Sequence, residues 1–206
     1  TFFNALTGFV NISKGKIRIN GESLRIAQQD QAIAYVPQNE GIDSQFPVSV
    51  WDVVMMGRYG SMNILRSQRE SDIQAVKDAI ERVDLMELSS TPIGNLSGGQ
   101  RKRTFLARAI AQRASILLLD EPFAGVDPVA VEDIQRIVAH LKKKNIGILI
   151  TDHNVQETLA ITDKTYLMFE GKILKAGNPE ELAEDEMVRK VYLGQNFELR
   201  KKKLSF

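Results

Sequence analysis

The chain has 206 residues, 43% of them hydrophobic and 26% charged, which suits one large globular domain or a domain with a subdomain. Its formal net charge is +1, so no overall field draws it toward nucleic acid or anionic lipid. The absence of cysteine excludes disulfides and thiolate metal sites and fits a reducing compartment. No apolar run approaches the roughly 18 residues that cross a bilayer.

The first half of the chain predicts short elements followed by a helical insert. Apolar spacing and the turn residues after it indicate a short helix and two strands, at 2–9, 16–20 and 33–36. Helical spacing then covers 48–57 and 71–88, with a mixed loop between them. A further helix is predicted from Gly98 to about Gln112.

The second half predicts a parallel sheet. Two continuous apolar runs, Ile116–Leu119 and Ile146–Ile150, flank a segment with helical spacing at 131–141. Strand, helix and strand in this order, with apolar strands, are typical of a parallel βαβ unit. A hairpin is predicted at 166–174, followed by two short helical segments and a basic end at 200–203.

A glycine pair opens the helix at 98–112, in the sequence Leu96-Ser97-Gly98-Gly99-Gln100. Two glycines at a helix start leave backbone N–H groups accessible and let an anion come close, and the helix dipole adds partial positive charge there. The pattern therefore predicts an anion site. The alternative is a glycine-rich N-cap with no ligand.

Two adjacent carboxylates end the apolar strand Ile116–Leu119. A parallel sheet binds ligands at the carboxyl edge of its strands, which is where Asp120 and Glu121 are expected. We expect Asp120 to hold Mg²⁺ directly or through water, and Glu121 to orient and deprotonate an attacking water. A solvated acidic turn is the alternative for these two residues.

Polar residues also follow the neighbouring predicted strands. His153 comes after the strand at 146–150, so it is expected at the same edge as Glu121, where it could donate to a γ-phosphate oxygen. A single histidine is more often a structural or surface residue. Gln38 follows the strand at 33–36, and by itself it carries no signal.

Together these motifs resemble those of an ABC ATPase, in that family's order and spacing and over nearly the whole chain. The matching segments are Gln38 (Q-loop), Leu96–Gln100 (signature), Ile116–Glu121 (Walker B), Ala124–Asp127 (D-loop) and His153 (switch histidine). The resemblance implies an α/β fold, with a P-loop NTPase (RecA-like) core, a mostly parallel sheet and an inserted α-helical subdomain. The expected division is a partial ATP-binding core at 1–47, a helical subdomain at 48–95, the rest of the core at 96–178, and C-terminal helices with a basic tail at 179–206.

The resemblance also implies an ATPase that uses ATP and Mg²⁺ and works as a head-to-tail dimer of two copies. Each ATP would lie between the phosphate loop of one copy and the signature of the other. The implied γ-phosphate contacts of the partner's nucleotide are Ser97, Gly98, Gly99 and Gln100. Asp127 would lie near the dimer seam, and Gln38 would sense Mg²⁺ and the attacking water. The expected partners are polytopic membrane permease subunits and no nucleic acid, and the expected place is the cytoplasmic face of the inner membrane, as a peripheral protein.

The family's phosphate loop, G-x-x-x-x-G-K-[ST], does not occur in the chain, since no glycine-lysine pair is followed by serine or threonine. We expect the loop to end just before Thr1, because Thr1–Leu6 resembles the helix that follows it. Losing even three charge-assisted bonds to phosphate costs roughly 5 kcal/mol, which is over a thousandfold in affinity. We therefore expect these 206 residues alone neither to bind ATP well nor to hydrolyse it.

The two halves of the chain resemble different transport ATPases. The first half resembles ATPases of manganese, zinc and iron-chelate uptake, at Phe46–Val50 and Asp52–Gly60. The second half resembles the ATPase of lipopolysaccharide export, at Asp127–Val131, Ile150–Val155, Glu157–Leu159 and Val191–Phe197. This indicates a mosaic with a junction near 120–127, and a slight preference for metal uptake, because the helical insert expected to contact the permease lies in the first half.

Other interpretations stay open. An ABC ATPase without a membrane subunit, as in DNA repair or translation, is one, although the chain shows no long insertion and no tandem ATPase unit. An inactive fragment is another. The basic end Arg200–Lys203 could bind an anionic lipid surface, but a solvated tail is the favoured interpretation.

Overall fold

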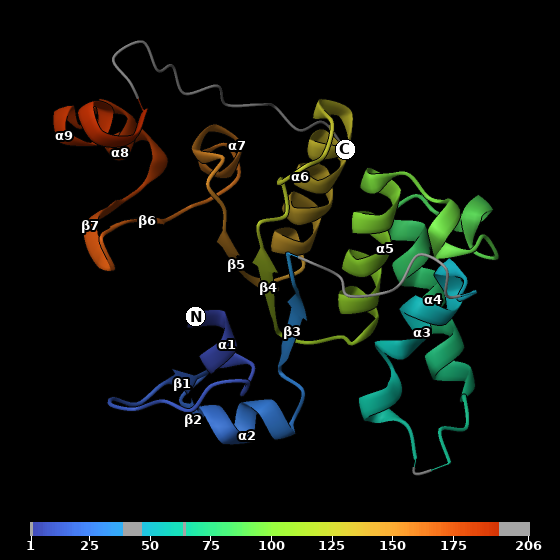
Figure 1. Ribbon diagram of the computed structural model, residues 1–206. Helices are drawn as coiled ribbons and strands as arrows, with labels where there is room; N and C mark the ends of the chain where they lie inside the picture. Colours follow the sequence, from blue (N-terminus) through green and yellow to red (C-terminus); the bar gives the residue numbers. More distant parts are fainter. Residues whose placement is uncertain (1, 39–46, 64, 194–206) are drawn as a thin grey trace. The chain divides into compact units, whose positions relative to one another are not determined.

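The structure is a computed structural model that describes residues 2–38, 47–63 and 65–193 (Figure 1). It divides into two compact units, Thr1–Thr151 and Asp152–Phe206. Three predicted features lie outside the described residues: Phe46, the segment 194–197 and the basic end 200–203. Among the described helices, none is long and apolar enough to cross a membrane.

The first unit contains a parallel sheet in the order β3 (Ile33–Val36), β4 (Ile116–Asp120) and β5 (Gly147–Thr151). In register, Val36 pairs with Leu119, and Asp120 pairs with Thr151. Helix α6 (Pro128–Lys143) connects β4 to β5, so the predicted parallel βαβ unit is confirmed. The side chains of Leu117, Leu118 and Leu119 are all buried, which explains why β4 reads as a continuous apolar run.

Short elements from the start of the chain pack on β4. They are α1 (Phe2–Leu6), β1 (Arg18–Ile19), β2 (Glu22–Ser23) and α2 (Leu24–Gln29), and their buried side chains form a core with Leu118. The predicted strand at 16–20 is only two residues long in the structure. Helix α2 was not predicted, because its six residues are too few to show helical spacing. Ser23 caps this helix by accepting a hydrogen bond from Ile26 N–H.

The helical segment consists of α3 (Val50–Met56) and α4 (Glu70–Arg82), which pack on each other and on α5 (Gly98–Ala111). Short 3-10 helices at Tyr59–Ser61, Met86–Leu88 and Ile93–Asn95 join them. Helix α4 ends six residues before the predicted residue 88, because Asp84 has a φ of 55°, which an α-helix cannot contain.

A buried ion pair holds this helical segment together. Arg58 Nε lies 3.0 Å from Asp72 Oδ1, and the two side chains are 11% and 3% exposed. Arg58 also donates to the carbonyl oxygen of Ala111 at 2.9 Å, at the end of α5. From there Gln112 donates to the carbonyl oxygen of Ile33 at 2.8 Å. The helical segment is therefore linked through polar contacts to the start of β3.

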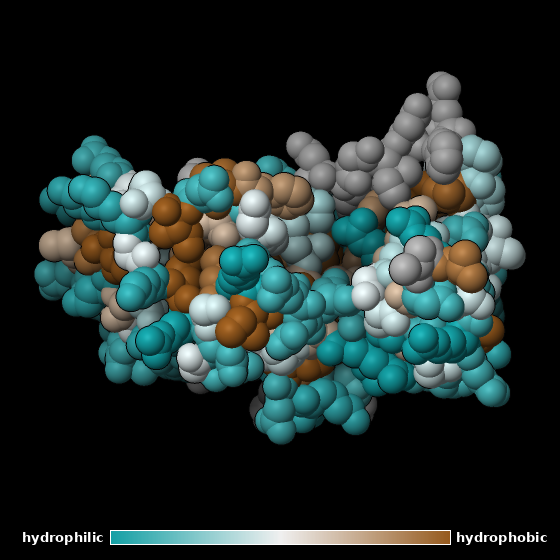
Figure 2. All heavy atoms as spheres, turned by 90° about the horizontal axis from the view of Figure 1, so that it is seen from below, coloured by the Kyte–Doolittle hydropathy of each residue, from teal (hydrophilic) through white to brown (hydrophobic). Residues whose placement is uncertain are grey.

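The second unit begins with α7 (Val155–Leu159) and continues into an antiparallel hairpin of β6 (Thr165–Phe169) and β7 (Lys172–Gly177), as predicted. Helices α8 (Pro179–Glu184) and α9 (Glu186–Val188) and a π-helix at Arg189–Leu193 follow. Its core contains Leu159, Leu167, Leu182 and Val188. Hydrophobic side chains also reach the surface among hydrophilic ones (Figure 2). The four-part division predicted from the sequence stays a prediction.

Candidate functional site

The carboxyl ends of β3 and β4 bring Gln38 and Glu121 into contact. Gln38 Nε2 donates to Glu121 Oε2 at 2.6 Å, although 83 residues separate the two in the chain. The register explains this contact, because Val36 pairs with Leu119 and each polar side chain follows two residues later. Residue type and spacing alone do not show that Gln38 and Glu121 meet. The parallel sheet predicted from the apolar runs places both at the same edge.

Asp120 is held by two hydroxyl groups. Thr151 Oγ1 donates to Asp120 Oδ1 at 2.6 Å, and the Tyr35 hydroxyl donates to Asp120 Oδ2 at 3.0 Å. Burial, the hydrogen bond to Asp120 and its negative charge raise the pKa of Tyr35 to about 12. Tyr35 therefore stays a neutral donor through the physiological pH range. Each carboxylate oxygen keeps a second lone pair for another ligand.

Tyr35 and Thr151 are functional candidates that the sequence interpretation missed. Both lie within apolar strands and have ordinary β-sheet propensity, so nothing in the pattern distinguishes them. The available signal is their place in the predicted sheet. Thr151 is the last residue of β5 and pairs with Asp120, so its hydroxyl could have been expected at this edge.

The start of α5 is capped by its own side chains. Ser97 Oγ accepts from Gln100 N–H at 3.2 Å, and Gln100 Oε1 accepts from Ser97 N–H at 2.9 Å. This capping box satisfies two backbone donors of the first turn. Ser97 and Gly98 are exposed, and a Cβ on Gly98 would meet nothing within 4 Å. The helix start is therefore open to a ligand at Gly98.

Gly99 and Asp127 lie side by side within the first unit. A Cβ on Gly99 would come 2.5 Å from the Cβ of Ala130 and 3.8 Å from Asp127 Oδ2. Asp127 caps α6 by accepting from Ala130 N–H at 3.0 Å. Both residues therefore have a structural role where α5 meets α6. The contacts of either residue with a nucleotide or a second copy stay predictions.

His153 belongs to the second unit. Its side chain is 72% exposed, and Nδ1 lies 3.8 Å from Asp152 Oδ1. Glu121 belongs to the first unit, so the predicted meeting of His153 and Glu121 at one edge stays a prediction.

The donors at the sheet edge suit Mg²⁺ only as part of a larger site. In residues 2–38, 47–63 and 65–193, no group of three or more His, Cys, Asp or Glu side chains could hold a metal ion. Asp120, Glu121 and Gln38 offer two carboxylates and an amide. Mg²⁺ is commonly held by one or two carboxylates together with waters and the phosphates of a substrate, so these residues fit that partial role.

Comparison with known proteins decides the family, since residues 1–124 match the model described as "ABC transporter". The chain belongs to the ABC transporter family. It is an ATP-binding domain of that family, and the predicted P-loop NTPase fold is confirmed by its structural relatives. A solved putative metal-chelate type ABC transporter in an inward-facing conformation superposes with a TM-score of 0.77 at 29% identity, covering 88% of this chain and 67% of that one.

Curated relatives of this ABC domain include subunits of a manganese transport system and of a lipopolysaccharide export system. The manganese transport ATP-binding protein MntA of Synechocystis is 44% identical over 181 residues, which are 88% of this chain and 69% of that protein. The lipopolysaccharide export ATP-binding protein LptB of Escherichia coli K12 is 37% identical over 203 residues, which are 97% of this chain and 82% of that protein. Relatives of both predicted kinds are therefore present.

Proposed function

We propose that this domain hydrolyses ATP as the energy-supplying subunit of a membrane transporter, with Glu121 as the general base and Asp120 as a ligand of Mg²⁺. The observation that carries this proposal is the 2.6 Å contact between Gln38 and Glu121 at the sheet edge where Asp120 also lies. A positioned base contributes about 10²–10⁴-fold to a rate. Bound Mg²⁺ supplies charge neutralisation on the phosphates.

The chain's own residues act by orientation. Tyr35 and Thr151 hold the carboxylate of Asp120 in one direction, and Gln38 does the same for Glu121. Because these side chains come from three neighbouring strands, the sheet fixes their separation before any ligand binds. His153 is proposed as a further donor to the γ-phosphate.

The site requires groups beyond these residues. We infer that the complete ATP site includes a phosphate loop and a second copy of the domain bound head to tail. The exposed start of α5 supports the second inference, because a Cβ built on Gly98 would meet nothing within 4 Å, so an anion can approach the backbone there. Ser97, Gly99, Gln100 and Asp127 would take part in the same contact.

Manganese or another metal ion is the proposed cargo, imported by a permease at the cytoplasmic membrane with this subunit bound peripherally to its cytoplasmic face. The support is the higher identity to the manganese relative and the resemblance of Phe46–Val50 and Asp52–Gly60 to metal-uptake ATPases. Lipopolysaccharide export is the second candidate, favoured by the alignment with LptB over 97% of the chain. The mosaic origin stays a prediction.

Co-purification separates the two candidates. The tagged full-length gene product is co-expressed with a manganese-type permease or with the membrane subunits of a lipopolysaccharide exporter. We expect a stable complex and faster ATP hydrolysis with the metal permease alone. A complex with the exporter alone would reverse the cargo assignment, and hydrolysis with neither partner bound would favour an ABC ATPase outside transport.

A further inference from the structure

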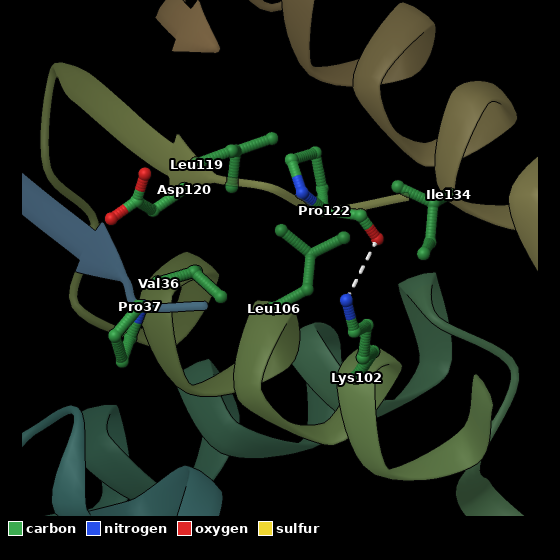
Figure 3. A pocket seen from close by; sticks show the side chains of 8 residues that line it. All are labelled: Val36, Pro37, Lys102, Leu106, Leu119, Asp120, Pro122 and Ile134. Carbon is green, nitrogen blue, oxygen red and sulfur yellow. Dashed lines mark hydrogen bonds between the residues drawn. The ribbon is translucent and has the colours of Figure 1, made fainter. Parts of the chain in front are cut away.

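The side chain of Lys102 connects α5 to the loop that follows β4. Lys102 Nζ donates to the carbonyl oxygens of Glu121, Pro122 and Ala124 at 3.1, 3.4 and 2.7 Å. An ammonium group has three N–H donors, so the three carbonyls can each accept one. Figure 3 shows this side chain rising from α5 to the carbonyl of Pro122.

This loop has a backbone shape that needs support. Glu121 has a φ of 47°, in the left-handed region that residues with a Cβ rarely adopt. Three carbonyl oxygens that converge on one point also repel each other. A cation at that point turns the repulsion into attraction. Lys102 therefore stabilises the loop in the conformation that follows the predicted base.

The surroundings of Lys102 leave little free space. It lines a small hollow with the apolar side chains of Val36, Leu106, Leu119 and Ile134, and with the carboxylate Asp120 (Figure 3). The hollow measures about 20 Å³, which is room for about one water molecule and far too little for a nucleotide. The contact is therefore part of the internal structure and not a ligand subsite.

We propose that Lys102 is a positioning residue, which fixes the Glu121 carboxylate against Gln38 by holding the backbone of Glu121. This inference rests on the proposed function of Glu121. It adds a link within one subunit, because Lys102 lies four residues after Gly98 and so shares a face of α5 with the open helix start. A ligand that shifts the start of α5 would act on the base through this side chain.

Loss of the ammonium affects chemistry more than binding. Lys102→Met keeps most of the length of the side chain and removes the three donors, so the loop is free to turn Glu121 away from Gln38. Misplacement of a base by about 1 Å can cost on the order of 100-fold in rate. We expect kcat for ATP to fall about 10- to 100-fold with KM within about threefold of wild type. Lys102→Arg keeps the charge but not the threefold donor geometry and should be intermediate.

The experiment has two readouts. ATP hydrolysis is measured in the full-length gene product carrying Lys102→Met, Lys102→Arg, or the control Lys77→Met on the exposed side of α4. Amide hydrogen exchange is measured in the same proteins without nucleotide. We expect faster exchange at 121–125 in Lys102→Met, unchanged exchange in α4, and wild-type behaviour in Lys77→Met.

The outcomes separate this inference from the proposed function. If amide exchange at 121–125 is the same in Lys102→Met as in wild type, the inference is wrong, whether or not the wild-type protein hydrolyses ATP. Absence of ATP hydrolysis in the wild-type protein would reject only the proposed function. Where the wild type is active, faster exchange with an unchanged kcat overturns the positioning role. If kcat falls equally in Lys102→Arg and Lys102→Met and amide exchange is faster throughout α4, Lys102 only supports folding. That outcome would also overturn the positioning role.

Discussion

Two adjacent glycines begin α5, and their surroundings differ. A Cβ at Gly99 would lie 2.5 Å from the Cβ of Ala130, whereas a Cβ at Gly98 would meet nothing within 4 Å. Gly99 is therefore required by the packing of α5 against α6. Gly98 has no such constraint within its own unit, which agrees with its proposed role in ligand access.

The two alanine variants are expected to behave differently. Gly99→Ala overpacks the contact with Ala130 and should lower the free energy of unfolding by about 1–3 kcal/mol. Gly98→Ala should change stability by less than about 1 kcal/mol and should weaken the proposed nucleotide-dependent dimerisation. Urea unfolding measures the first effect, and gel filtration with MgATP measures the second. Equal destabilisation by both variants would contradict this assignment.

At the scale of elements, Arg58, in the segment that follows α3, contacts Asp72 of α4 and the end of α5. The pair is buried and its Nε–Oδ1 distance is 3.0 Å. Desolvation by burial acts to raise the pKa of Asp72, but hydrogen bonds from the Arg69 backbone N–H and the Arg58 side chain, together with the charges of both arginines, outweigh it. The pKa of Asp72 is therefore held below its ordinary value of 3.8.

Removing one partner leaves the other charge buried, so Arg58→Met should cost about 3–5 kcal/mol of unfolding free energy. The exposed pair Arg113–Asp78, at 3.9 Å, provides the matched control, and Arg113→Met should cost less than about 1 kcal/mol. Chemical denaturation at pH 7 measures both. Similar costs for the two variants would show that burial of the Arg58 pair contributes nothing.

The same pair sets a pH dependence. Because the folded pKa of Asp72 is depressed, its contribution to stability is complete above the unfolded value near 3.8 and is lost as the pH falls through the lower folded value. Arg58→Met should remove part of that acid-dependent loss. The acid arm of the stability curve should therefore be shallower in Arg58→Met than in wild type.

At the scale of the whole molecule, the apolar runs located the parallel sheet, because strands covered on both faces, such as β4, give a continuous apolar signal. The same runs placed Asp120 and Glu121 at a strand end. The short elements β1, β2 and α2 were found poorly, since two to six residues show no period. The end of α4 was also misplaced, because the left-handed backbone at Asp84 has no sequence signal comparable to glycine.

Sequence motifs were enough to predict the site residues, whereas the contacts around these residues could be found only from the fold. Gln38 carried no signal until the sheet placed it 2.6 Å from Glu121. Tyr35, Thr151 and Lys102 were missed because their hydroxyl and ammonium groups act through distant partners, which only the register and the crossing of α5 bring near. Local patterns therefore identify the candidate carboxylates Asp120 and Glu121, and tertiary contacts identify the groups that orient them.

The role of Glu121 as the base is tested most directly by separating nucleotide binding from turnover in Glu121→Gln. In the full-length gene product, we predict that MgATP affinity stays within about threefold of wild type while turnover falls about 10²–10⁴-fold, because only the proton acceptor is removed. Glu87→Gln, at an exposed carboxylate in the helical segment, should leave both unchanged. Turnover by Glu121→Gln at the wild-type rate, or a loss of affinity as large as the loss of rate, would contradict the assignment.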